Sequence, residues 1–167
     1  KINRRGFLKS SGFALAGLAL PKNLASSSTP ISRLGRVTSE SLSVYQEPSE
    51  NSQILFQHFR DDILNIYQDV ISEDGPGYNP LWHRVWGGYV HSAWVQRVRN
   101  QLNPVLKTFP STGQLMEVSV PFTQSYRIRQ NGAWEPFYRL YHTSTHWVFE
   151  VLEGPDGEAW YKVNNSL

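Results

Sequence analysis

The chain has 167 residues, of which 40% are hydrophobic, 13% aromatic and only 18% charged. This composition excludes a disordered chain, a coiled coil and a collagen-like chain, because all three are poor in aromatic residues. The sequence contains no Cys, which excludes a disulfide framework, a Cys-ligated metal centre and a thiol nucleophile.

Charge is distributed unevenly along the chain. Seven basic residues and no acidic residue occur between Lys1 and Arg36, whereas the rest of the chain has nine basic and fourteen acidic residues, a net charge of −5. Nucleic-acid binding requires a basic face on the folded domain, because contacts with phosphate supply most of the affinity. We therefore expect no nucleic-acid partner.

Residues 1–25 have the pattern of an export signal. A basic start is followed by a short apolar stretch, too short to span a bilayer, and by a polar end with small residues. Arg4 and Arg5, with Phe7 and Leu8 behind them, resemble the twin-arginine signal, which directs folded proteins across the bacterial inner membrane. The resemblance implies an exported protein that uses the twin-arginine export machinery as a partner and has no stable membrane span.

The next segments alternate between flexible and strand-like composition. Residues 26–33 are rich in Ser, Thr and Pro, which predicts a flexible linker. Residues 34–99 read as a first domain, in which β-branched and aromatic runs between turn signals predict strands at 42–45, 64–67, 82–86 and 89–91. Gly87-Gly88 predicts a two-residue hairpin turn, because primed turns need positive φ angles.

A second cycle follows a break rich in Pro and Gly. We expect a linker at 100–113 and a second domain at 114–167, with strands at 115–120, 137–141, 146–151 and 159–163. The run Leu81–Val85 aligns with Ala159–Val163, and each run follows a strand and an acidic Gly-Pro loop, which indicates a duplicated module. The second copy stops soon after this match, so we expect it to be incomplete.

Three pieces of the first copy resemble bacterial SH3-like domains. These pieces are Leu42–Ser49, the Trp-x-x-Val run Trp82–Val85, and the Gly-Tyr-Val-His-Ser run Gly88–Ser92. The resemblance implies an all-β chain of tandem small SH3-like β-barrels. The order of leader and two modules further resembles the N-terminal half of exported L,D-transpeptidases, which cross-link peptidoglycan.

That second resemblance implies a non-catalytic, cell-wall-associated region, with peptidoglycan as its partner and with the catalytic Cys domain outside these residues. Two alternatives stay open. The modules could be a purely structural spacer, or they could belong to another exported wall hydrolase, such as an amidase or an endopeptidase.

No motif in the sequence indicates an enzyme, a cofactor or a metal site within these residues. The chain has five His residues, but none lies in a spacing that brings three zinc ligands together, so we expect structural or exposed imidazoles. The adjacent carboxylate pairs Asp61-Asp62 and Glu73-Asp74 are expected to be solvated turn residues rather than a glycosidase pair.

The aromatic residues divide into two groups. Large rings in the duplicated strands are expected to fill the two barrel cores: Trp82, Trp160, Tyr67 and Phe149. Rings on the opening loop and around the glycine hairpin are expected to line a groove for an extended peptide or glycan: Tyr45, Trp86, Tyr89 and Trp94. The alternative for this second group is packing against the second module.

Overall fold

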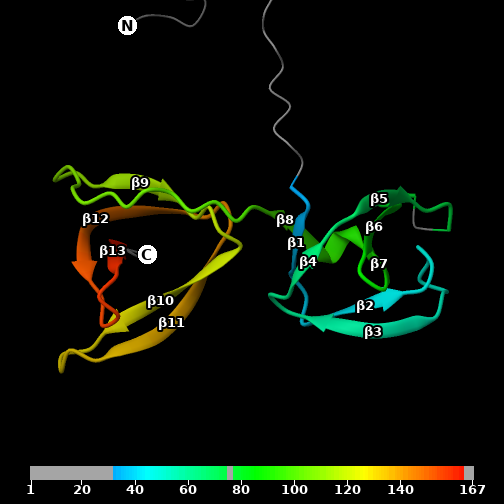
Figure 1. Ribbon diagram of the computed structural model, residues 1–167, viewed down its shortest axis with the longest axis horizontal. Coiled ribbons are helices and arrows are strands. Elements are labelled where there is room, and N and C mark those ends of the chain that lie inside the picture. The colour runs from blue at the N-terminus through cyan, green and yellow to red at the C-terminus, as the bar shows by residue number, and fades with distance from the viewer. Residues whose placement is uncertain (1–31, 75–76, 164–167) are drawn as a thin grey trace, which may run out of the picture. The chain divides into compact units, whose positions relative to one another are not determined.

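The computed structural model describes residues 32–74 and 77–163 (Figure 1). The export-signal residues Arg4, Arg5, Phe7 and Leu8 lie outside the described residues. Strands of the first repeat are β1 (Leu34–Val37), β2 (Ser41–Tyr45), β3 (Ile54–Phe59), β4 (Ile63–Asn65), β5 (Gln68–Ile71), β6 (Leu81–Val85), β7 (Gly88–His91) and β8 (Val95–Val98), with the 3-10 helix η1 (Ser92–Trp94) before β8. Strands of the second repeat are β9 (Gln114–Glu117), β10 (Phe122–Ile128), β11 (Trp134–Tyr141), β12 (Thr145–Glu153) and β13 (Ala159–Val163).

The strands form four small antiparallel sheets. The first repeat has a three-stranded sheet, β4-β1-β8, and a five-stranded sheet, β3-β2-β7-β6-β5. The second repeat has a three-stranded sheet, β13-β12-β9, and the two-stranded sheet β10-β11. The prediction of an all-β chain is therefore confirmed, although none of these sheets closes into a barrel. Across the described ranges, no helix is long and apolar enough to cross a bilayer.

The glycine hairpin lies one residue earlier than predicted. Trp86 and Gly87 form the turn, and Gly88 is already the first residue of β7, paired with Val85. Gly87 supplies the positive φ, at +81°. Gly88 is needed for a different reason: a Cβ there would clash with the carbonyl oxygen of Tyr45 and lie 2.9 Å from Cγ1 of Val44. One glycine therefore makes the turn, and the other allows β7 to approach β2.

The core of the first repeat is aliphatic. Its buried cluster consists of Val37, Leu42, Val44, Leu64, Ile66, Val85, Val90 and Val95. Trp82 is fully buried, as predicted, but it is not part of this cluster. Since alternate residues of a strand point to opposite faces, Trp82 lies on the face of β6 opposite Val85. There its ring makes T-shaped contacts with Tyr45 and His91, at centroid distances of 5.4 and 5.1 Å.

Two of the predicted core aromatics are not in a core. Tyr67 is 59% exposed, because β4 ends at Asn65 and Tyr67 lies in the bend before β5. Phe149 is 39% exposed and lies at a register irregularity of β12, where its ring covers Gly113. Both predictions were wrong for the same physical reason: a ring at an irregular point of a strand is not held on the inward face.

The two repeats share the same backbone hydrogen bonds at the corner between the third strand and the next. The residue at the corner has a positive φ in both, +70° at Asp61 and +68° at Thr143. Val37 N–H donates to Asp62 O (3.0 Å), as Val118 N–H does to Ser144 O (2.9 Å). Asp61 N–H donates to Val37 O (3.0 Å), as Thr143 N–H does to Val118 O (2.9 Å). Asp62 N–H donates to Phe59 O (3.0 Å), as Ser144 N–H does to Tyr141 O (3.0 Å).

Strand register and aromatic packing repeat as well. Trp82 pairs with Val70, and Trp160 pairs with Leu152 at the equivalent position. The edge-to-face contact of Tyr45 on Trp82 has its counterpart in Tyr126 on Trp160, with a centroid distance of 5.2 Å and an interplanar angle of 88°. Within the part of the chain that the structure describes, however, no element of the second repeat corresponds to β7, η1 or β8.

Candidate functional site

Two of the predicted ligand-binding residues lie side by side on the outer face of the five-stranded sheet. Tyr45 of β2 and Tyr89 of β7 are directly opposite each other. Because Val44 and Val90 point into the core, their neighbours Tyr45 and Tyr89 point to the other face. Both are half-buried, and Tyr45 leans on Trp82. The arrangement is a rigid aromatic surface with polar hydroxyl ends.

The two predicted tryptophans lie at opposite ends of β7. Trp86 is at the hairpin tip, 72% exposed, with its ring 5.8 Å from that of Phe56. Trp94 is the last residue of η1, which follows the far end of β7, and its carbonyl accepts a hydrogen bond from Thr38 N–H (2.9 Å). Four strand residues cover about 13 Å, so the expectation that Trp94 sits beside the glycine hairpin was wrong. The aromatic surface therefore consists of Tyr45 and Tyr89, because Trp86 contacts Phe56, which packs against the core on the other side of the sheet.

The buried histidine His83 lies on the opposite, core-facing side of β6. Oδ1 of Asp69 lies 2.8 Å from Nδ1 of His83 and also forms an ion pair with Arg97. Burial lowers the pKa of His83 below its ordinary value, because the charged imidazolium would lose its hydration, and this effect outweighs the hydrogen bond with Asp69, which raises the pKa. His83 therefore acts as a structural, neutral partner of Asp69.

Three of the other histidines have local partners, whereas the buried Nδ1 of His142 has no hydrogen-bond partner among the described residues. His58 contacts the Asp62 carboxylate at 3.2 Å, and His91 contacts the Asn79 carbonyl at 3.1 Å. His146 contacts the Ser144 hydroxyl at 3.0 Å. Over residues 32–74 and 77–163, no group of three or more His, Cys, Asp or Glu side chains is placed to hold a metal ion.

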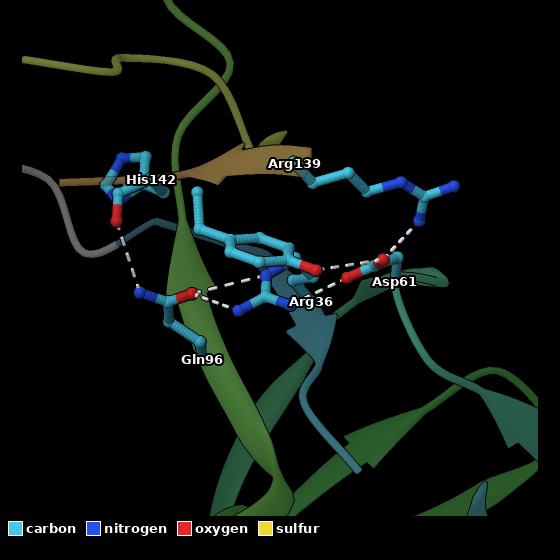
Figure 2. Close-up of polar contacts among 6 residues, drawn as sticks. Arg36, Asp61, Gln96, Arg139 and His142 are labelled. Carbon is cyan, nitrogen blue, oxygen red and sulfur yellow. Dashed lines mark hydrogen bonds and ion pairs between the residues drawn. The ribbon is translucent and has the colours of Figure 1, made fainter. Parts of the chain in front are cut away.

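The structure contradicts the prediction that Asp61 is a solvated turn residue. Asp61 is only 8% exposed, and its Oδ1 accepts a hydrogen bond from Nη1 of Arg36, itself buried, at 2.7 Å. Its Oδ2 pairs with Arg139 of the second repeat. Figure 2 shows Arg36 and Arg139 both pointing at Asp61. By contrast Glu73 and Asp74 are exposed, as predicted, and Asp62 is half-buried, with its carboxylate in contact with Phe59 N–H and His58.

Residues from both repeats complete this buried ion pair. Gln96 Oε1 accepts two hydrogen bonds from Arg36, at 2.8 and 3.2 Å, and Gln96 Nε2 donates to the carbonyl of His142 at 3.4 Å (Figure 2). The Arg36 guanidinium lies 4.1 Å from the centre of the Tyr141 ring. Nε, Nη1 and Nη2 of Arg36 all donate to protein acceptors, so this buried guanidinium serves as a structural joint rather than as a ligand site. A basic residue within a strand of a net-acidic domain was the only sequence signal for it.

The second repeat contains an open apolar cavity that no sequence pattern indicated. Its volume is about 850 Å³. Its walls include Met116, Val118, Leu140, Val148 and Leu152, with Tyr126, Trp134 and Trp160 on one side. Of the hydrophobic side chains buried in the described residues, Val148 alone belongs to the second repeat. Trp160, predicted to be a core residue, is only half-buried.

The aromatic side of this cavity is an ordered cluster. The rings of Trp134 and Trp160 are 5.3 Å apart, and Tyr126 contacts both. The indole Nε1 of Trp160 donates to Asp156 at 2.9 Å, and this hydrogen bond lowers the pKa of the Asp156 carboxyl. The cluster is held in place by contacts within the repeat, so the cavity is preformed.

No protein-family model matches the chain, and no match is found among curated proteins or among solved structures.

Proposed function

We propose that the chain is an exported, non-catalytic, cell-wall-associated region of a peptidoglycan-cross-linking L,D-transpeptidase, built from two SH3-like modules. Peptidoglycan is the proposed ligand, and the reaction takes place in another part of that protein. The proposal rests first on the sequence resemblance of the leader and of the first repeat. The repeated small antiparallel sheets support it, because an SH3-like module is also made of short antiparallel strands.

One observation carries the proposed binding role: the aromatic surface of Tyr45 and Tyr89. Aromatic faces stack on sugar rings and on extended peptides, both of which occur in peptidoglycan. Both tyrosines are half-buried, so part of each ring is accessible to a ligand. A sheet face holds the two tyrosines in place, so they lose little conformational entropy on binding.

We predict that the full chain sediments with insoluble peptidoglycan and that Tyr89→Ala weakens this binding about tenfold, which corresponds to about 1.4 kcal/mol for a lost stacking contact. The matched control is Trp86→Ala, which removes an exposed ring that contacts Phe56 on the core-facing side of the same sheet. It should leave binding unchanged. Co-sedimentation over a range of peptidoglycan concentrations measures both.

The same experiment separates the alternatives. A structural spacer would stay in the supernatant at every peptidoglycan concentration. Equal losses for Tyr89→Ala and Trp86→Ala would mean that binding is nonspecific and that the aromatic surface is not the site. If the parent protein is a wall hydrolase, the chain would bind peptidoglycan in the same way. The catalytic residues of the parent protein then distinguish a hydrolase from an L,D-transpeptidase.

The export proposal has its own test. Because recognition of a twin-arginine signal depends on the guanidinium pair, replacing Arg4 and Arg5 together by Lys should block export while the folded repeats stay unchanged. Fractionation of bacterial cells that produce the full chain measures this. Undiminished export of the Lys-Lys variant through the route for folded proteins would overturn the proposal.

A further inference from the structure

The two strands that border the cavity of the second repeat have unpaired edges. In the first repeat, β7 lies between β2 and β6 and pairs with both. Their counterparts in the second repeat are β10 and β13. Among the described residues, β10 pairs only with β11, and β13 pairs only with β12. The position that β7 takes in the first repeat is therefore vacant in the second.

The vacant edges have the geometry that β7 uses. β6 presents Trp82, His83, Arg84 and Val85 to β7, and the equivalent residues of β13 are Trp160, Tyr161, Lys162 and Val163. On the other side, β2 pairs with β7 through Tyr45, and the residue at the same place in β10 is Tyr126. The backbone N–H and C=O groups along these edges are free to form a ladder on both sides of an incoming strand.

The cavity is where the side chains of such a strand would be buried. In the first repeat the core receives Val90 from β7, which is fully buried, and Val95 at the start of β8. Among residues 100–163 no side chain fills the corresponding space of the second repeat, whose cavity of about 850 Å³ is lined by the strands that face it. Burying apolar residues there removes hydrocarbon surface from water on both partners.

We propose that the slot between β10 and β13 binds one extended polypeptide strand with the chemistry of β7. The strand has Gly opposite Val163, because the same backbone approach makes a Cβ at Gly88 clash with the Tyr45 carbonyl. Two residues further on, it has a β-branched apolar residue opposite Tyr161, as Val90 is opposite His83. This inference is independent of the wall-binding proposal, which concerns the first repeat.

Two other occupants fit less well. A glycan has no row of alternating donors and acceptors at the spacing of a strand, so it would leave the two edges unpaired. A second copy of the chain would offer β13 itself, whose residues Ala159–Val163 include no Gly for the position next to Tyr126. A strand of β7 chemistry satisfies both requirements.

The test is a chimera in which the residues after Val163 are replaced by a second copy of residues 86–98, which carry the turn, β7, η1 and β8. Hydrogen exchange should slow at least about tenfold at the edge amides of β10 and β13, because a newly paired amide must open before it exchanges. The matched control is the same chimera with Gly88→Val and Val90→Asp in the appended copy only. It should exchange like the unmodified chain.

A second measurement covers a chimera that misfolds. A synthetic peptide of residues 86–98 is added to the unmodified 167-residue chain, and protection of the same amides is followed as the peptide concentration rises. Protection that the Gly88→Val, Val90→Asp peptide fails to give supports the proposal. Absence of protection in both experiments overturns it. Protection of β13 in the unmodified chain alone, appearing with a dimer, overturns it in favour of a second copy.

Discussion

Replacing Trp82 with Ala is expected to lower the free energy of unfolding of the first repeat by about 3 to 5 kcal/mol, the usual loss for a buried aromatic side chain. Trp82 has no exposed surface, and its ring packs edge-to-face against Tyr45 and His91. Removing it leaves a large hole under the aromatic surface. Because small domains have only about 5 to 15 kcal/mol of stability, we expect a much lower midpoint in chemical denaturation or loss of cooperative unfolding.

The matched control is Trp160→Ala in the second repeat. Trp160 occupies the equivalent position opposite Leu152 and contacts Tyr126, but it is half-buried on an edge strand beside an open cavity. Trp160→Ala removes less buried apolar surface than Trp82→Ala, so its expected cost in the free energy of unfolding is about half or less of that for Trp82→Ala. Equal costs for the two variants would show that the second repeat is as tightly packed as the first.

Replacing Asp61 with Asn is expected to cost about 3 kcal/mol or more, because it leaves the buried guanidinium of Arg36 without its carboxylate. Arg36 and Asp61 are both nearly inaccessible, with their contact at 2.7 Å. Asn tolerates the positive φ of this position, at +70°, about as well as Asp, so backbone strain does not contribute. Chemical denaturation of the full chain measures the loss.

The control for this variant is Asp62→Asn, one residue away and half-buried. Its side-chain oxygen can still accept the hydrogen bond from Phe59 N–H, so the expected change is within about 0.5 kcal/mol. Replacing Arg36 by Met in the Asp61→Asn background should recover part of the loss, because the uncompensated charge is removed. Similar effects of Asp61→Asn and Asp62→Asn would mean that the ion pair contributes no more than a surface charge.

Local sequence patterns predicted the strands well where the chain is regular. The run Ala159–Val163 is β13 to the residue, and Leu42–Tyr45 lies within β2. The match between Leu81–Val85 and Ala159–Val163 identified the repeat, which the structure extends to hydrogen bonds and register. These features depend on the alternation of side chains within one strand, and that alternation is written directly in the sequence.

The sequence by itself determined the all-β class, the internal repeat and the burial of Trp82. Only the tertiary structure decided which face of each strand is covered and which distant residues meet. Asp61 is buried because Arg36, 25 residues earlier, and Arg139, 78 residues later, converge on it. Likewise, within the described residues, β10 and β13 each pair with a neighbour on one side only. A period-two pattern specifies that successive residues alternate, but which side is inward, and whether an edge is paired, depends on strands far away in the chain.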